Sequence, residues 1–224
     1  LTGTGTASLG GGRTITSDST FGTATAPDSL TLSGVITDGV VTFAITKVGA
    51  GSLILSNANT YDGGTTLSAG TLSVGNNSAL GTGSLALNAG TLSASTGGIH
   101  LANTFTVGGT GASIGGSNSL TLSGAGTLSA LLTNTNTAAT TLSGALSGTN
   151  GITQNSASTL TLSGAGTNTY DGTTTVSQGT LIASKASALG STLGATSVAS
   201  GATLNINNVA IGNEALSITG TGVG

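Results

Sequence analysis

The sequence of 224 residues contains no cysteine, no methionine and no tryptophan, and its only proline is Pro27. Without cysteine it can form neither disulfide bonds nor thiolate metal sites. Asp, Glu, Lys and Arg make up only 4% of the residues, and the net charge of −3 offers no basic face. Binding to nucleic acid through phosphate neutralisation is therefore disfavoured. No apolar run approaches the length of about 18 residues that a membrane-spanning helix needs.

Glycine is abundant, with 40 positions, and small aliphatic residues recur at regular intervals. Disordered chains are poor in hydrophobic residues and rich in charge, so this chain is expected to fold around a core of small aliphatic side chains. We expect a single domain over residues 1–224, with repeats in 30–92 and 141–204 and less regular N-terminal rungs in 1–29. Since the chain starts at Leu1 without a signal-peptide pattern, we interpret it as a mature product or an excerpt.

One stretch occurs twice, as residues 61–81 and 170–190, and 13 of its 21 positions are identical when the copies are aligned without a gap. Both copies open on Tyr-Asp-Gly. These sites, together with three later glycines, are the structural turn and repeat residues that the sequence singles out: Tyr61, Asp62, Gly63, Gly70, Gly90, Tyr170, Asp171, Gly172 and Gly179. Because the copied features are turns and leucines, we interpret Tyr-Asp-Gly as a tight corner whose tyrosine covers the core edge with its hydroxyl in water. Two ligand-contacting tyrosines are the alternative.

Words such as Leu30-Thr-Leu32-Ser-Gly34 alternate apolar and hydroxyl residues, which is typical of half-buried strands. Glycines between such words predict bends with positive φ. Four of these glycines follow one another at nearly equal intervals: Gly51, Gly70, Gly90 and Gly109. This regular spacing is poorly kept around residues 134–155. A period of about 20 residues predicts a solenoid of about eleven rungs, although a sandwich or barrel also fits short strands with frequent turns.

Residues 47–72, from Lys-Val-Gly-Ala-Gly to Gly-Thr-Leu, resemble the autotransporter-associated β-strand repeat, also called the passenger-associated transport repeat. Residues 159–181 resemble it more loosely, because Gln154-Asn-Ser-Ala-Ser replaces the usual lead-in. The resemblance implies an all-β fold, a right-handed parallel β-helix (β-solenoid) with rungs of about 20 residues. It also implies an extracellular location at a bacterial cell surface, associated with the outer membrane.

The sequence predicts no catalytic, cofactor-binding or metal-binding residue. Paired carboxylates would be needed for polysaccharide cleavage, and the acidic residues are scattered along the chain: Asp18, Asp28, Asp38, Asp62, Asp171 and Glu214. The only histidine, His100, has no obvious partners for a metal site or a catalytic triad. The three basic residues, Arg13, Lys47 and Lys185, are expected to be solvated, with the Lys47 stem over one end of the core.

These observations favour a structural role as a stalk, adhesion or matrix scaffold that needs no cofactor. Partners would be neighbouring repeats or copies of the chain end to end, with surface glycans or host and matrix proteins as further candidates and no nucleic acid. The alternative is a subunit of an extracellular filament or sheath, because unpaired solenoid ends invite end-to-end pairing. A polysaccharide-active enzyme and a Thr-array ice-binding surface are disfavoured, the latter because the Thr-x-Thr words are irregularly spaced.

Overall fold

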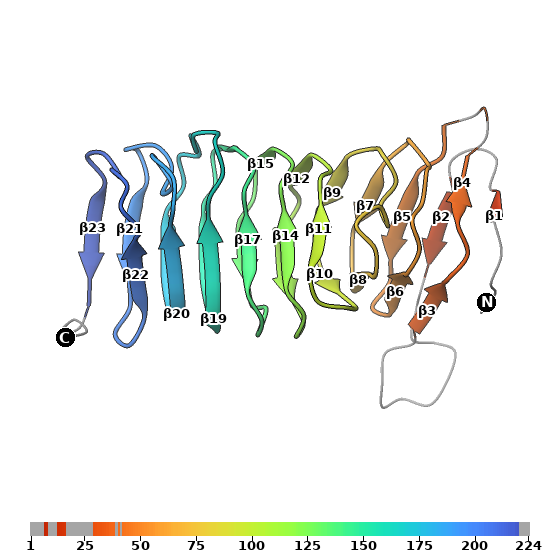
Figure 1. Cartoon of the computed structure of the whole chain (residues 1–224), viewed down its shortest axis with the longest axis horizontal. Coiled ribbons are helices and arrows are strands. Elements are labelled where there is room, and N and C mark those ends of the chain that lie inside the picture. The colour runs from red at the N-terminus through yellow and green to blue at the C-terminus, as the bar shows by residue number, and fades with distance from the viewer. Residues whose placement is uncertain (1–6, 9–12, 17–28, 39, 41, 220–224) are drawn as a thin grey trace.

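The computed structural model describes residues 7–8, 13–16, 29–38, 40 and 42–219, with side chains described from Ser29 onward. The described residues form twenty-three short strands. No helix long and apolar enough to cross a membrane occurs among them. Every pairing between described strands is parallel, and the rungs stack along one long axis (Figure 1). The predicted parallel β-solenoid is therefore confirmed.

The strands form three columns, which we name A, B and C in the order in which the chain visits them. Column A contains β3 (Ser29–Leu32), β6 (Ser52–Leu55), β8 (Thr71–Val74), β10 (Thr91–Ala94), β13 (Ala112–Gly115), β16 (Leu132–Asn134), the first parts of β19 (Ile152–Leu162) and β20 (Thr174–Ala183), β21 (Ala195–Val198) and β23 (Ala215–Ile218). Column B contains β11 (Ile99–Leu101), β14 (Leu120–Leu122), β17 (Thr140–Leu142), the second parts of β19 and β20, and β22 (Thr203–Ile206). Column C contains β2 (Arg13–Thr16), β5 (Ile45–Val48), β7 (Thr65–Leu67), β9 (Leu85–Leu87), β12 (Phe105–Val107), β15 (Gly126–Leu128) and β18 (Leu146–Gly148). Outside these columns, β1 (Ala7–Ser8) pairs with β4 (Ile36–Thr37).

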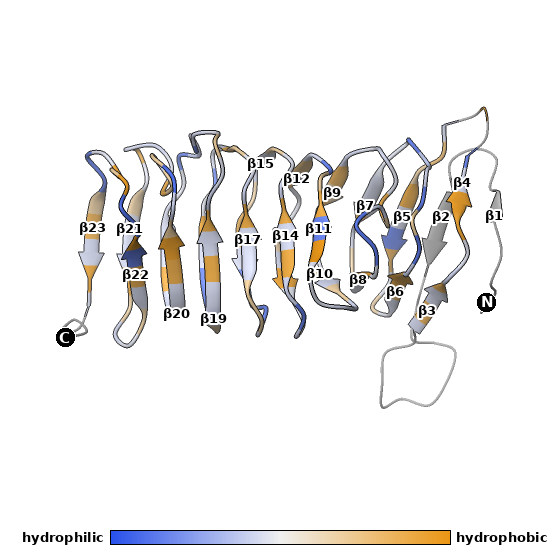
Figure 2. Ribbon diagram, in the orientation of Figure 1, coloured by the Kyte–Doolittle hydropathy of each residue, from blue (hydrophilic) through white to orange (hydrophobic). Residues whose placement is uncertain are grey.

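Alternation along each strand separates an inner from an outer face. In β6, Leu53 and Leu55 are fully buried, whereas Ser52 and Ile54 are partly exposed. Leu53 pairs with Leu72, and Leu72 pairs with Leu92, so that leucines stack in adjacent rungs as the solenoid interpretation requires. Each fully buried leucine contributes roughly 1.5–3 kcal/mol relative to an exposed one. Figure 2 shows hydrophobic segments recurring in successive rungs. Stacked aliphatic side chains therefore stabilise the coil along most of its length.

The coil makes about nine turns from Leu30 to Ile218, with a typical rung of about 20 residues. The estimate of about eleven rungs refers to the whole chain, and the described part from Leu30 to Ile218 accounts for about nine turns. Some rungs exceed the typical length, such as the step from Leu30 to its partner Leu53. The step from Arg13 to its partner Ile45 is longer still. Longer corners lengthen a rung without adding height to the stack.

The two copies of the sequence repeat lie on different faces of the coil. In the first copy, Thr65–Leu67 belongs to column C and Thr71–Val74 to column A. The corresponding residues 174–176 and 180–183 of the second copy belong to columns A and B. The copies are therefore separated by five turns plus one face. This shift explains why the regular spacing of bend glycines is lost around residues 134–155. Gly70 and Gly90 lie where the chain turns from column C to column A, whereas Gly179 lies where it turns from column A to column B.

Candidate binding surface

Both tyrosines of the repeat are buried rather than wet. Tyr61 and Tyr170 are 0% exposed. Their hydroxyls share hydrogen bonds of 2.6 Å with Thr65 Oγ1 and Thr174 Oγ1, a short distance further along the chain. The Tyr61 ring also packs edge-on against Phe43, with ring centroids 5.8 Å apart. The expected solvated hydroxyl was wrong, because a threonine inside the coil supplies the partner. The tyrosines are core residues and offer nothing to a ligand.

Burial gives the chain a defined response to alkaline pH. It raises the pKa of both tyrosines far above the ordinary value of about 10. Above pH 10 the unfolded chain therefore loses protons that the folded chain retains, so the free energy of unfolding falls as pH rises. Burial also lowers the pKa of Lys185 to about 8. Between that value and its ordinary pKa near 10.4 the unfolded chain binds the extra proton, so this group adds stability as pH rises.

We therefore expect the free energy of unfolding to rise from about pH 8 towards 10 and to fall above it, as measured by urea titration with circular dichroism. The Lys185→Met variant should lose the rise and keep the fall. In the folded chain, the near-ultraviolet absorbance should show no tyrosinate until unfolding begins, because burial keeps both tyrosines protonated. The signal is easy to measure because the sequence contains no tryptophan. Ordinary titration of both tyrosines near pH 10 in folded protein would contradict the burial.

An asparagine just before each tyrosine connects three rungs. Asn59 is buried; its Oδ1 accepts from the Ile36 N–H at 2.8 Å, and its Nδ2 donates to the Ala79 carbonyl at 2.6 Å. Asn168 repeats this arrangement, accepting from the Leu146 N–H at 3.0 Å and donating to the Ala188 carbonyl at 2.7 Å. Sequence reasoning missed both residues, although Asn-Thr-Tyr-Asp-Gly recurs as 59–63 and 168–172. They satisfy backbone groups where a rung has no neighbouring strand.

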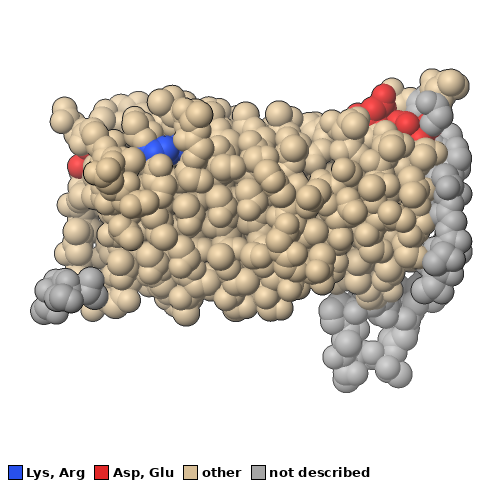
Figure 3. Space-filling view, viewed as in Figure 1, with Lys and Arg blue, Asp and Glu red and all other residues tan. Residues whose placement is uncertain are grey.

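The acidic residues are less scattered than the sequence suggested. The Asp62 N–H donates to Asp38 Oδ2 at 2.8 Å across one rung. This hydrogen bond lowers the pKa of Asp38, while the neighbouring Asp38 side chain raises the pKa of Asp62. In the second copy, Asp171 Oδ1 accepts from Ser191 Oγ at 2.6 Å instead. Figure 3 shows acidic side chains at one end of the visible face, another acidic and a basic group near the other end, and an uncharged expanse between them.

The glycine that follows each aspartate is required by the close approach of the preceding rung. A Cβ on Gly63 would lie 2.5 Å from the Phe43 carbonyl oxygen, and one on Gly172 would lie 2.2 Å from the Asn150 carbonyl carbon. The bend glycines differ in that they combine close contact with positive φ, which is 69° at Gly70, 82° at Gly90 and 65° at Gly179. All five positions are structural requirements of the corners.

Two lysines expected in solvent are buried in the corners. Lys47 is 0% exposed, and its Nζ donates to the carbonyls of Val48 and Gly49 at 2.7 Å and of Ala69 at 3.2 Å. Lys185 is 5% exposed, and its Nζ donates to the Gly144 carbonyl at 2.8 Å. A buried ammonium group needs acceptors, and the corner carbonyls provide them. The side chain of Arg13 lies outside the described part of the chain.

A polar layer interrupts the aliphatic interior in the segment where the sequence pattern is poorest. In column A, the inward positions of Asn134 and Gln154 pair in register and follow Ile114. Asn134 Nδ2 donates to Gln154 Oε1 at 2.6 Å, and Thr140 Oγ1 donates to Asn134 Oδ1 at 3.0 Å. Both amides are fully buried, with Asn134 1% and Gln154 0% exposed. Asn134, Thr140 and Gln154 thus satisfy one another, whereas the buried Oδ1 of the neighbouring Asn136 has no hydrogen-bond partner among the described residues.

The outer face of column A carries a hydroxyl group in every rung. Register pairs join Thr71 with Thr91, Thr91 with Ser113, and Ser113 with Thr133. We call this row the hydroxyl ladder: Ser29, Ser52, Thr71, Thr91, Ser113, Thr133, Thr153, Thr175, Ser197 and Ser217. Neighbouring strands lie about 4.8 Å apart, which sets the spacing of the row. The irregularly spaced Thr-x-Thr segments did not make this ladder evident in the sequence, because the ladder uses serine and threonine interchangeably and those segments do not mark it.

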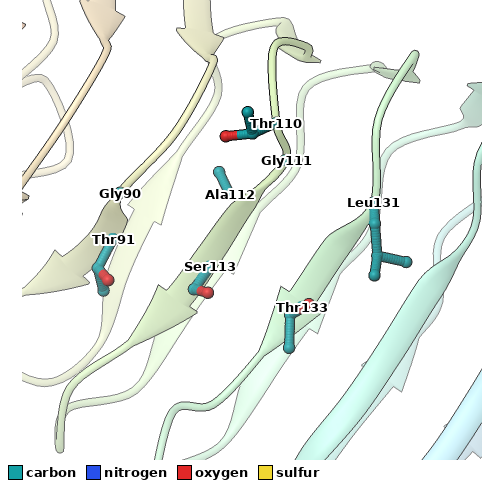
Figure 4. Close-up of a pocket in the computed structure, with 8 residues that line it drawn as sticks. All are labelled: Gly90, Thr91, Thr110, Gly111, Ala112, Ser113, Leu131 and Thr133. Carbon is teal, nitrogen blue, oxygen red and sulfur yellow. The ribbon is translucent and has the colours of Figure 1, made fainter.

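A pocket lies along the ladder over β10, β13 and β16. It has a volume of about 310 Å³ and is lined by Gly90, Thr91, Thr110, Gly111, Ala112, Ser113, Leu131 and Thr133 (Figure 4). Four of these side chains are hydroxylic, and Leu131 is 43% exposed at its edge. Among the described residues, no group of three or more His, Cys, Asp or Glu is placed to hold a metal ion. The chemistry that the pocket offers is hydrogen bonding next to small apolar groups.

The coil is thus a parallel β-solenoid. The two corners at which a tyrosine and an asparagine are buried coincide with the repeated sequence element. The passenger-associated-transport-repeat family model matches residues 45–74 and 152–183, which confirms the resemblance seen in the sequence. The chain is also 46% identical over 63 residues to the Adhesin BmaC autotransporter of Brucella suis biovar 1 (strain 1330). That match covers 28% of this chain and 2% of the relative. No solved structure matches significantly.

Proposed function

We propose that the chain is a structural passenger segment of a cell-surface autotransporter-like protein, where it serves as a stiff stalk that contributes to adhesion. The observation that carries the proposal is the uninterrupted coil of about nine turns. Each passenger repeat supplies the buried tyrosine and asparagine that stabilise one of its corners. Each rung contacts only its neighbours, so such a coil lengthens by adding rungs without changing those already formed. Nine rungs at about 4.8 Å correspond to a rod of roughly 43 Å. The adhesin relative supports a surface location and a non-enzymatic role.

The test is to display the chain on a non-adherent Gram-negative host, between an export signal and an outer-membrane barrel. Deleting residues 62–170 removes the interval between the two copies and leaves the Tyr-Asp-Gly junction intact. We expect display of the full chain to increase attachment to epithelial monolayers and the deletion to reduce it, with both proteins at equal surface density by antibody labelling. Equal attachment with and without the chain would contradict adhesion. A compact scattering profile in solution would contradict the rod.

Self-assembly is a second candidate, and the last described rung favours it. Leu216 and Ile218 continue inward columns from Thr196 and Val198, yet they are 41% and 61% exposed. Among the described residues β23 pairs only with β21, and its other edge, with these exposed aliphatic side chains, is open to a further parallel strand from a following repeat or from a second copy of the chain. We expect Leu216→Lys with Ile218→Lys to abolish concentration-dependent association in sedimentation velocity, since two charges would then face the joint. A matched Thr121→Lys with Thr141→Lys variant on the side of column B should associate like the parent chain. A parent chain that stays monomeric would remove this candidate.

A further inference from the structure

We propose that the hydroxyl ladder is a docking track for a neutral linear polysaccharide and that the pocket at Thr91, Ser113 and Thr133 anchors it. The inference rests on the proposed adhesive function and gives it a class of ligand. Column A runs without a gap from β3 to β23, whereas column B begins at β11 and column C ends at β18. A ligand lying along the whole rod has this face alone available without interruption.

The chemistry of the track fits a sugar polymer. A serine or threonine hydroxyl both donates and accepts hydrogen bonds, as sugar hydroxyls do. The pocket is lined by the hydroxyl-bearing side chains of Thr91, Thr110, Ser113 and Thr133, and the exposed Leu131 supplies an apolar group at its edge. Such a mixture suits a pyranose ring, which presents hydroxyls at its rim and C–H groups on its faces. Small-ligand sites place a few polar groups in an apolar concavity, whereas hydroxyl groups dominate the lining of this pocket, as suits a ligand rich in hydroxyls.

Charge selects among polymers. The strands of column A contain no Asp, Glu, Lys or Arg. Lys47 and Lys185, the two basic residues with described side chains, are buried. The face therefore has no cation to neutralise a nucleic acid, an acidic glycan or an anionic lipid surface. An uncharged partner loses no ionic hydration on docking there.

The pattern is one-dimensional, and this separates a polymer from a crystal surface such as ice. A lattice needs at least two regular rows. The outward row beside the ladder reads Thr31, Ile54, Ser73, Ser93 and Gly115 in successive rungs. Ser73 is 9% and Ser93 8% exposed, so this second row is neither uniform nor accessible. One regular row matches a linear chain of repeating units.

The test is amide chemical-shift mapping of the ¹⁵N-labelled full chain with cellohexaose, chitohexaose and maltohexaose, and with hexagalacturonate as the charged comparator. We expect saturable shifts at Thr91, residues 110–113 and Thr133 with at least one neutral oligosaccharide and none with hexagalacturonate. Thr91→Val with Thr133→Val should weaken binding about tenfold, because two hydrogen bonds are lost while side-chain shape is kept. The matched control, Thr121→Val with Thr141→Val, removes two outward hydroxyls from column B and should bind like the parent chain.

No saturable shift with any neutral oligosaccharide, or equal weakening in both double variants, would overturn the inference. Thermal hysteresis without oligosaccharide binding would overturn it in favour of a lattice. If cells displaying the chain attach to monolayers while none of the oligosaccharides binds, this inference alone fails. If the oligosaccharides bind at the pocket while display does not increase attachment, the adhesive function alone fails.

Discussion

Replacing Gly70 with alanine should lower the free energy of unfolding by about 3 kcal/mol or more. A left-handed conformation costs a non-glycine residue about 1–2 kcal/mol, and φ at Gly70 is 69°. The new Cβ would also lie 2.4 Å from the carbonyl oxygens of both Gly49 and Gly51, so backbone in the preceding rung must move. Overpacking of this kind adds about 1–3 kcal/mol. Urea unfolding followed by circular dichroism measures the loss.

Gly201→Ala is the matched control. Its φ of 80° is similar, but no atom lies within 4 Å of the position of its Cβ. We expect a loss of only about 1 kcal/mol there, from backbone conformation alone. Equal losses at the two positions would show that rung-to-rung contact at Gly70 is unimportant. Native-state hydrogen exchange should locate the added opening of Gly70→Ala in residues 49–72.

Truncating a repeat tyrosine should cost even more. Tyr61→Ala removes a fully buried ring that packs against Phe43, and large-to-small changes of this kind cost about 3–5 kcal/mol. Tyr61→Phe keeps the ring and loses only the hydrogen bond to Thr65, so about 1–2 kcal/mol is expected. The measurement is urea unfolding of both variants at neutral pH, where the tyrosine is uncharged.

The second copy provides an internal replicate on another face of the coil. Tyr170 has the same burial and the same 2.6 Å hydrogen bond, to Thr174. We expect Tyr170→Ala and Tyr170→Phe to reproduce the losses at Tyr61 within about 1 kcal/mol, because most of the cost comes from local packing. A nearly neutral Tyr170→Ala would mean that the two corners are not equivalent in energy.

Much of the fold could be read from local chemistry. Period-2 words such as Leu30-Thr-Leu32 indicate strands, since one face of each must be buried. Glycine bends that repeat once per rung indicate a coil. Side-chain environments at the corners were harder to predict. Lys47 and Tyr61 look amphipathic in sequence, and only the carbonyls and Thr65 that surround them in three dimensions make their burial favourable.

The candidate binding surface was also beyond sequence reasoning. Members of the hydroxyl ladder recur at unequal intervals along the chain, because corners differ in length, so no fixed period links Ser52, Thr71 and Ser113. Asp38 and Asp62 are far apart in sequence, and they meet because they lie in adjacent rungs of the coil. The signal was present for the asparagines of Asn-Thr-Tyr-Asp-Gly, since they recur with the tyrosines.

By itself the sequence determined short strands with one buried face and a repeat of about 20 residues, and it favoured a coil over a sandwich or barrel because similar segments recur once per period. Tertiary structure decided how the coils align. The lengths of the corners between the two copies of the repeat together decide which columns the second copy occupies. As a result, the second copy lies in columns A and B, whereas the first lies in columns C and A. The same corner lengths leave one column, lined with hydroxyls, continuous from Ser29 to Ser217.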